Sequence, residues 1–463
     1  MGSRRSVVTI LTAMLLTAGC GADPGAAVSD TFTYALNSEP SCLDPQISPA
    51  DATALITRGV VDSLVAQDAS GDVKPWLATA WRISADLKTY TFTLRDGVTF
   101  HDGTPFDAAA VKANFDRIVA PDTKSQYAST LIGPYTGSTV HDPHTVEIHL
   151  GQPFQPFLQA VSTPFLGMES PKSFTGGASC GQVVGSGPFT FAEYIRQQHV
   201  ELRRNPAYNW APPTAAHSGA AHLQKVVIRF LPENATRLGA LTGGQVDGIG
   251  AVPTPNVATV KADSALRFVH TNQPGAAYSV YLNTAAGAFT DVRVRRAFQH
   301  AIDIDLLVRS IHFGVYDRAW SMLSPNTRFY DKTLENSWSF DQAEANSLLD
   351  AAGWTARDSE GYRRRGGQRL SVHWPTSPQQ DAADQRGLFG QGIQAAEKQV
   401  GIEVVRDSVP SGKLFELVAE GQYDISDMSW ARSDPDILRG FLASTCMPMS
   451  GQNIARVADA TVD

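Results

Sequence analysis

Threonines alternate with apolar residues along residues 89–94, and two Asp-Gly dipeptides follow before a partly apolar stretch at 107–118. A period of two is typical of a strand with one buried and one solvent-facing side. Asp-Gly pairs supply the positive φ angles that tight turns need. Asp107 can cap a helix whose apolar residues recur every three or four positions. The residues expected in the core are Tyr90, Phe92, Leu94, Val111, Phe115 and Ile118.

The same two periods continue along the chain and predict strands that alternate with helices. A strand at 145–150 is expected to pair with the strand at 89–94, and the order strand, helix, strand within 226–247 predicts a crossover unit. Further strands are expected at 31–36, 278–283, 370–374, 402–405 and 423–430. Helices are expected at 51–64, 234–241, 291–302, 341–352, 387–400 and 411–421. This alternation indicates an α/β protein.

The composition is that of a globular protein, with 43% hydrophobic and 18% charged residues, and 463 residues suffice for two or three lobes. The net charge of −8 argues against nucleic acid as a partner. The basic run from Arg363 to Arg365 lies between glycines, and we interpret it as an exposed turn.

The first twenty residues have the pattern of an export signal. Arg4 and Arg5 precede an apolar run at 7–16 that is too short to span a bilayer as a mature helix, and small residues lead to Cys20. This arrangement resembles a bacterial lipoprotein signal, in which residues 1–19 are removed and Cys20 becomes the lipidated first residue. We therefore predict a protein held by lipid at the cell membrane and facing outward, in the periplasm or outside the cell.

Three cysteines remain, and an exported protein is expected to pair them where geometry permits. Cys42 follows the first predicted strand, and Cys180 precedes a Gly-Ser-Gly-Pro-Phe segment. We predict a Cys42–Cys180 disulfide that closes a long loop. Cys446 would then be free or paired with another molecule. A metal site made of these three cysteines is the alternative, although the chain has no CxxC spacing.

The chain lacks the zinc-protease motif HExxH and the Walker sequence of nucleotide-binding sites. Histidines at 141, 144 and 149 flank an Asp-Pro turn and could suggest a metal site, but we interpret them as polar turn residues. His217 and His222 receive the same interpretation. We therefore expect no enzyme activity, no metal site and no cofactor.

Several longer motifs follow one another between residues 31 and 463. They are E-P-x-x-L-D-P at 39–45, A-x-x-W at 78–81, L-R-x-G-V-x-F-H-D-G-x-P at 94–105, G-S-G-P-F at 185–189, F-x-D-x-R-V-R-x-A at 289–297 and A-x-x-L-L-x-x-A-G-W at 345–354. Together they resemble the peptide- and nickel-type solute-binding proteins of ABC importers (family 5, cluster C). Any one of these motifs is weak, whereas the ordered set is specific.

The resemblance implies a two-lobed fold of the type II periplasmic-binding-protein kind, which is α/β with α+β insertions and an extra inserted lobe. We expect lobe I at 20–51 and 184–277, the inserted accessory lobe at 52–183, and lobe II at 278–463. Family members continue with a further segment that returns to lobe I. The present chain ends before it, and we expect a truncated chain.

Candidate ligand-binding residues lie where predicted strands end in loops, because α/β lobes present ligand groups there. Peptide-binding relatives carry W-x-x-D-x-x-D-P, whose first aspartate holds the ammonium group of the peptide. This chain has the shorter W-x-x-x-D-P, so Asp434 can align with the aspartate before proline, and it can alternatively cap a helix near Ile437. Arg432 favours a carboxylate or another acidic group. The full set of candidates is Trp430, Asp434, Arg432, Tyr281, Asn283 and, more weakly, Glu39.

The resemblance implies a monomeric extracytoplasmic lipoprotein that captures a solute between two lobes and delivers it to the permease of an ABC importer. An oligopeptide or dipeptide is the expected solute, and a nickel chelate or another small molecule is the alternative. A secreted hydrolase and a sensor on the same scaffold are the rival interpretations.

Overall fold

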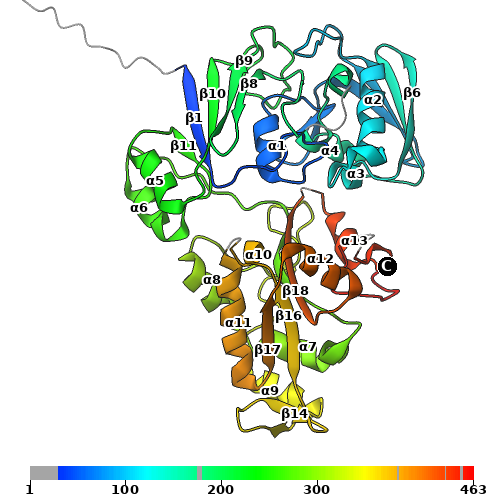
Figure 1. Cartoon of the computed structure of the whole chain (residues 1–463). Coiled ribbons are helices and arrows are strands. Elements are labelled where there is room, and N and C mark those ends of the chain that lie inside the picture. Colours follow the sequence, from blue (N-terminus) through cyan, green and yellow to red (C-terminus); the bar gives the residue numbers. More distant parts are fainter. Residues whose placement is uncertain (1–29, 175–179, 383–384, 433, 449–451) are drawn as a thin grey trace, which may run out of the picture.

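The computed structural model describes residues 30–174, 180–382, 385–432, 434–448 and 452–463 (Figure 1). Lobe I and the accessory lobe lie side by side in the upper part of Figure 1, and lobe II lies below them. This arrangement confirms the two-lobed α/β architecture with an inserted lobe. The predicted signal peptide and Cys20 fall outside the described residues. Within the described ranges, every helix is too short or too polar to cross a bilayer.

Lobe I is built on a sheet whose strands come from both sides of the insertion. The strands are β1 (Thr31–Leu36), β8 (Phe189–Ile195), β9 (His199–Arg204), β10 (Lys225–Phe230) and β11 (Gly248–Ile249), in the spatial order β11-β1-β10-β9-β8. Because β1 is parallel to both β10 and β11, helix α5 (Asn234–Thr242) is the predicted crossover. Glu233 caps α5, since its carboxylate accepts the backbone N–H groups of Ala235 and Thr236. Helix α6 (Val257–Ala262) follows.

The border between lobe I and the accessory lobe lies later than predicted. Helix α1 covers only Asp51–Thr57, and the chain then turns. Ile56, Val60 and Val61 are fully buried against the core of the lobe I sheet. Leu64 is the first buried member of the accessory core, and the partly buried Ala54 of α1 also packs against that core. We place the border near residue 62 and not at 52, because Ile56, Val60 and Val61 pack on lobe I.

The accessory lobe consists of an antiparallel sheet covered by a helix, and its order β4-β5-β7-β6 confirms the predicted pairing. The strands are β4 (Ala78–Ile83), β5 (Thr89–Leu94), β6 (Tyr135–Asp142) and β7 (Thr145–Leu150), and the helix is α2 (Ala108–Val119). A separate hairpin pairs β2 (Val65–Gln67) with β3 (Val73–Pro75), and two short helices are α3 (Ala128–Leu131) and α4 (Phe157–Ala160). The Asp107 carboxylate accepts the Ala110 N–H at 2.8 Å, as predicted for the cap. All six predicted core residues of this stretch are at most 4% exposed.

Lobe II contains two central strand pairs and helices on both sides. β12 (Gly275–Leu282) is antiparallel to β18 (Ile425–Ala431), and β16 (Ser371–Thr376) is parallel to β17 (Glu403–Ser408). The helices are α7 (Val292–His300), α8 (Ile304–His312), α9 (Gln342–Ala351), α10 (Pro378–Ala382), α11 (Arg386–Val400), α12 (Ser411–Glu420) and α13 (Ile437–Leu442). A small sheet of β13 (Ala356–Arg357), β14 (Arg363–Arg365) and β15 (Gln368–Arg369) lies at the far end (Figure 1). β12 begins at Gly275, three residues before the predicted start of the lobe.

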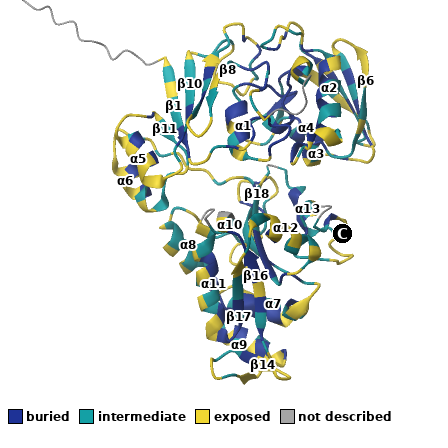
Figure 2. Ribbon diagram, viewed as in Figure 1, coloured by how far each residue is buried: buried dark blue, intermediate teal, exposed yellow. Residues whose placement is uncertain are grey.

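Burial in lobe II follows the helical period of the segment predicted as a helix at 291–302. Figure 2 shows the buried residues concentrated on the central strands and on the inner faces of the helices. The stripe on and just after α7 is at most 5% exposed, and its members are Val294, Ala297, Phe298, Ala301 and Ile302. Asp291 and Asp341 cap α7 and α9 by accepting backbone N–H groups at 2.9 Å. Gly353, Gly401 and Gly421 follow helices with positive φ angles of 85°, 94° and 74°.

Two features join lobe I to the accessory lobe. The predicted Cys42–Cys180 disulfide is present, and the backbone N–H of Leu43 also donates to the carbonyl of Cys180. Cys446 is a free, buried cysteine. The second feature is the buried Asp62 carboxylate, which accepts Trp210 Nε1–H at 2.8 Å and the Ser186 hydroxyl at 2.9 Å. Burial is the main cause that raises the pKa of Asp62 to about 6.

Candidate functional site

The end of β18 carries an aromatic residue that touches the accessory lobe. The ring of Trp430 lies 5.6 Å from the ring of Tyr127, at an angle of 57°. Tyr127 precedes α3 and also meets Phe165 edge-on at 4.8 Å. Trp430 packs against hydrophobic residues of both the accessory core and lobe II. Burial raises the pKa of Tyr127 above its usual value. This contact makes β18 the place where lobe II meets the accessory lobe.

Charged side chains follow Trp430 in the loop between β18 and α13. The Arg432 guanidinium lies 3.9 Å from the carboxylate of Asp436, and its backbone N–H donates to the carbonyl of Pro274. The Asp434 carboxylate accepts the backbone N–H of Asp436 at 2.8 Å, so it stabilises its own loop. It does not cap α13, whose N-cap residue Asp436 makes no side-chain capping bond. Partial burial raises the pKa of Asp434, although the Asp436 N–H and the Arg432 charge oppose this rise.

A cleft of about 850 Å³ opens beside these residues, between the accessory lobe and lobe II. Its accessory-lobe wall includes Asp68, Ser70, Ile83 and Gln155, and its lobe II wall includes Asn326, Arg328, Phe329, Asp434 and Asp436. Ile83 and Phe329 remain 41% and 75% exposed, so the cleft offers apolar surface next to carboxylates. Phe329 has a φ angle of 65°, a left-handed conformation that costs free energy for a side chain of this size. The volume falls in the range of pockets that hold small molecules.

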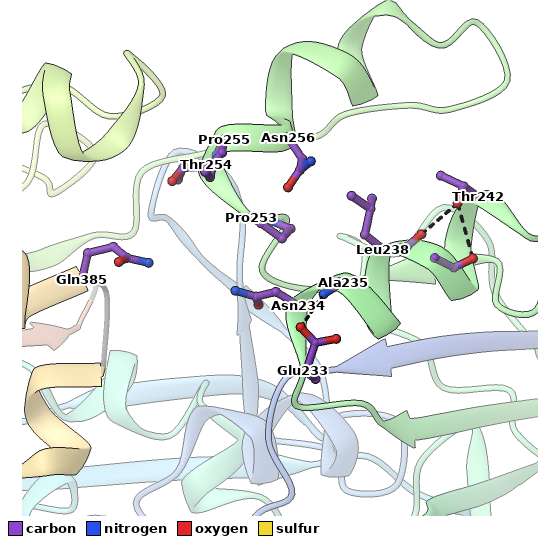
Figure 3. Close-up of a pocket in the computed structure, with 11 residues that line it drawn as sticks. Glu233, Asn234, Ala235, Leu238, Thr242, Pro253, Thr254, Pro255, Asn256 and Gln385 are labelled. Atoms are coloured by element: carbon purple, nitrogen blue, oxygen red, sulfur yellow. Dashed lines mark hydrogen bonds between the residues drawn. The ribbon is translucent and has the colours of Figure 1, made fainter.

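A second hollow lies where lobe II faces α5 of lobe I. It measures about 550 Å³, and Figure 3 shows Gln385 of lobe II facing Asn234 and Thr254 of lobe I across it. The carboxylate of Glu233 on its wall already caps α5. This hollow therefore offers fewer available polar groups than the larger cleft.

Next to Trp430, the other face of β18 carries a buried polar cluster. The Arg386 guanidinium donates to the Ser429 hydroxyl at 2.9 Å and lies 3.4 Å from the Asp427 carboxylate. Asp427 is 3% exposed and also accepts hydrogen bonds from Trp374 Nε1 at 3.0 Å and Gln380 Nε2 at 2.8 Å. These bonds hold the end of β18 in place and place a cation at the start of α11.

Three of the predicted site residues lie away from Trp430. Tyr281 is buried in the lobe II core, where its ring stacks on Phe441 at 5.6 Å. Asn283 is 1% exposed, and its amide donates to the backbone carbonyl of Tyr423 at 2.9 Å. The structure places both side chains inside lobe II and not in the cleft, because β12 is covered there by packed neighbours. Glu39 lies in lobe I, where its carboxylate accepts the Tyr194 hydroxyl at 2.6 Å.

The structure brings Trp430, Arg432 and Asp434 together, and it adds residues that sequence reasoning did not single out. Tyr127 and Phe329 belong to irregular segments with no helical or strand period. Arg386 begins a helix and looks like an ordinary surface residue in the sequence. Only the packing of distant segments places them near β18, so a local pattern could not have found them.

The histidines that flank the Asp-Pro turn lie on the exposed strands β6 and β7. His141 Nε2 and His149 Nε2 lie 3.5 and 3.7 Å from oxygens of Glu147. In the part of the chain that the structure describes, no group of three or more His, Cys, Asp or Glu residues is arranged to hold a metal ion.

Comparison with known proteins agrees with this architecture. The family model for bacterial extracellular solute-binding proteins, family 5 Middle, matches residues 72–445, and the chain belongs to this family. It is 28% identical over 400 residues to the nickel-binding periplasmic protein of Escherichia coli (strain K12). This match covers 84% of this chain and 73% of that protein. It is 30% identical over 346 residues to the glutathione-binding protein GsiB of Salmonella paratyphi A. That match covers 74% of this chain and 65% of the relative, so the chain spans less than two thirds of its length.

Solved structures show the same fold. NikA from Brucella suis in complex with Fe(III)-EDTA is 26% identical, with a TM-score of 0.78 over 92% of this chain and 84% of that chain. The oligopeptide-binding protein AppA from Bacillus subtilis in complex with a nonapeptide has a TM-score of 0.74 at 20% identity, over 93% and 85% of the two chains. The family and the fold make this chain a solute-binding protein of the extracytoplasmic, type II kind.

Proposed function

We propose that this protein captures an oligopeptide or dipeptide between its lobes and delivers it to the permease of an ABC importer. The observation that carries the proposal is the Tyr127–Trp430 contact across the lobes, beside a cleft of about 850 Å³ with walls from both lobes. A ligand that touches both walls binds the closed arrangement better than an open one, and it thereby stabilises the form that a permease would recognise.

The chemistry of the cleft supports a zwitterionic solute. On the cleft wall, Asp434 is an acceptor suited to an ammonium group and Arg328 supplies donors suited to a carboxylate, whereas Asp436 is already paired with Arg439. Arg432 lies in the adjoining loop. The exposed ring of Phe329 and the side chain of Ile83 offer surface to apolar side chains. A free peptide carries all three kinds of group. The similarity to a relative named for glutathione binding favours the same class.

A nickel chelate is the second candidate, because the E. coli relative is named for nickel binding. Among the residues that the structure describes, those lining the larger cleft include no histidine and no cysteine. These are the side chains that hold nickel most readily in proteins, so a metal would enter as a chelate whose organic part contacts the protein.

The protein would act without catalysis, as a monomer held at the outer face of the membrane by lipid on Cys20. The export pattern before Cys20 and the family membership support this placement. Mass spectrometry of the protein purified from a native membrane would detect a diacylated Cys20. We expect the Cys20→Ala variant to appear in the soluble fraction. An unmodified Cys20 in the native protein would contradict the lipid anchor.

Native mass spectrometry of the purified protein tests the solute directly, because a co-purified ligand adds its own mass. Titration calorimetry with dipeptides, tripeptides, glutathione and nickel–histidine then ranks the classes. Peptide binding with a Kd in the micromolar range or tighter is expected. Absence of binding by every peptide, together with binding of the nickel chelate, would replace the first candidate by the second. Turnover of a peptide, abolished by one substitution, would indicate the rival hydrolase function.

A further inference from the structure

Arg318 of lobe II is buried between two tryptophans. Its side chain is 4% exposed, and its guanidinium carbon lies 3.5 Å from the centre of the Trp320 ring and 4.1 Å from that of Trp338. Stacking of a guanidinium on indole rings is favourable and fixes the plane of the cation. The directions in which its N–H groups point are therefore set by the fold.

The hydrogen bonds of this guanidinium are one-sided. Nη1 donates to the Asp305 carboxylate at 2.8 Å, whereas Nε and Nη2 are buried and have no hydrogen-bond partner among the described residues. Within that same part of the chain, Arg318 is the only arginine whose Nε and Nη2 atoms are both buried and both without a hydrogen-bond partner. Buried donors of a charged group are rarely left unpaired, because they lose their hydration without compensation.

The unpaired atoms form a complete recognition edge. The Nε–H and one Nη2–H of a guanidinium point in the same direction and match the two oxygens of a carboxylate or phosphate. Asp305 is bonded to a different nitrogen, Nη1, and its side chain is 42% exposed. Water therefore screens much of the Asp305 charge, and the buried Nε/Nη2 edge keeps its positive potential. We propose that the Nε/Nη2 edge of Arg318 is a binding site for an oxyanion of the carboxylate type.

The site lies in the segment that leads to the rim of the cleft. After Arg318, the Met322 carbonyl accepts the N–H of Ala277, and Leu323 bridges to Ala276, which pairs with Trp430. The oxyanion has two possible sources: a free anion, or the carboxylate of a captured solute. The site itself goes beyond the proposed function and does not depend on which solute is transported.

Thermal unfolding of the full chain, freed of co-purified solute, tests the site with acetate as the probe. Sodium acetate and sodium phosphate are titrated against sodium chloride at matched ionic strength. Wild type is expected to show a saturable rise of about 2 °C or more in Tm with acetate. Arg318→Lys keeps the charge but loses the planar edge, so the rise should disappear. Arg309→Lys, at an exposed arginine of α8, should retain it.

A second measurement keeps the test independent of the variant. The ¹⁵N-resolved Nε–H resonance of Arg318 in wild type should shift on addition of acetate, and this readout decides alone if Arg318→Lys does not fold. The proposal is overturned if neither acetate nor phosphate gives a saturable response. That result would be expected if only an ordered water occupied the edge. An equal response in Arg318→Lys would overturn it as well.

The source of the oxyanion follows from competition with the dipeptide Ala-Phe and its C-terminal amide. Loss of the acetate response with Ala-Phe but not with the amide assigns the edge to a solute carboxylate. If neither Ala-Phe nor its amide changes the acetate response, the edge is a separate anion site. This conclusion holds whether or not either compound binds elsewhere in the protein.

Discussion

The indole ring of Trp430 and the phenol ring of Tyr127 are in contact at 5.6 Å, although Trp430 is the penultimate residue of a strand of lobe II and Tyr127 precedes a short helix of the accessory lobe. The pair is the aromatic bridge between these lobes. It lies beside the larger cleft and brings the charged loop after β18 to the cleft wall.

Removal of this bridge is expected to weaken solute binding more than it weakens folding. Trp430→Ala should raise the Kd for the bound solute about tenfold or more, because a large, half-buried aromatic anchor is lost. Calorimetry measures the change. Phe415→Ala, at a 73% exposed aromatic of α12, is the matched control and should bind as wild type. Equal affinities for wild type and Trp430→Ala would contradict the placement of the site.

The charge of Asp434 should matter for one part of the solute only. Asp434→Asn keeps the shape and the bond to the Asp436 N–H but removes the negative charge. We expect it to weaken binding of a free dipeptide about tenfold and to leave the N-acetylated dipeptide unaffected, because only the former has an ammonium group. A similar loss for both peptides would show that Asp434 acts through the loop and not through charge.

Asp62 should make stability depend on pH. Its folded pKa is about 6, above the usual 3.8, so the folded state binds the proton more tightly than the unfolded state. Stability from this group is present below pH 3.8 and is lost as the pH rises to 6 and above. The loss is on the order of 2–3 kcal/mol. Urea unfolding at pH 4.5 and 7 measures it.

Asp62→Asn is the control for that experiment, since the amide does not titrate. The variant should be less stable overall at neutral pH, because a neutral amide oxygen accepts the hydrogen bonds of Trp210 and Ser186 more weakly than a carboxylate oxygen does. Its stability should nevertheless change less between the two pH values than that of wild type. If stability changed equally with pH in the two proteins, the pH dependence would belong to other buried acids. Glu397 is one such acid, because burial also raises its pKa.

The Cys42–Cys180 disulfide should stabilise the joint between lobe I and the accessory lobe. The two cysteines are separated by 138 positions in the sequence, so reduction restores much freedom to the unfolded chain. We expect a loss of about 2–5 kcal/mol in Cys42→Ser/Cys180→Ser or after reduction. Cys446→Ala should respond to reductant as wild type does, because Cys446 is not part of the disulfide. Chemical denaturation with and without reductant compares the three proteins.

Local patterns in the sequence predicted much of the fold. The alternation at 89–94, the Asp107 cap and the helix at 291–302 each depend on neighbours within a few residues, and the structure confirms all three. The helix predicted at 51–64 ended early at Thr57, because the pattern does not reveal where the chain turns back. The lobe border moved for a related reason, since Val60 and Val61 found their apolar partners in lobe I.

By itself, the sequence determined the family, the order of the elements and the candidate loop with Trp430, Arg432 and Asp434. Tertiary structure alone decided which residues share a site. It placed Tyr127 against Trp430, buried Tyr281 and Asn283 inside lobe II, and enclosed Arg318 between Trp320 and Trp338. The physical reason is that periodicity records which face of an element is apolar, whereas burial and contact depend on which distant segment covers that face.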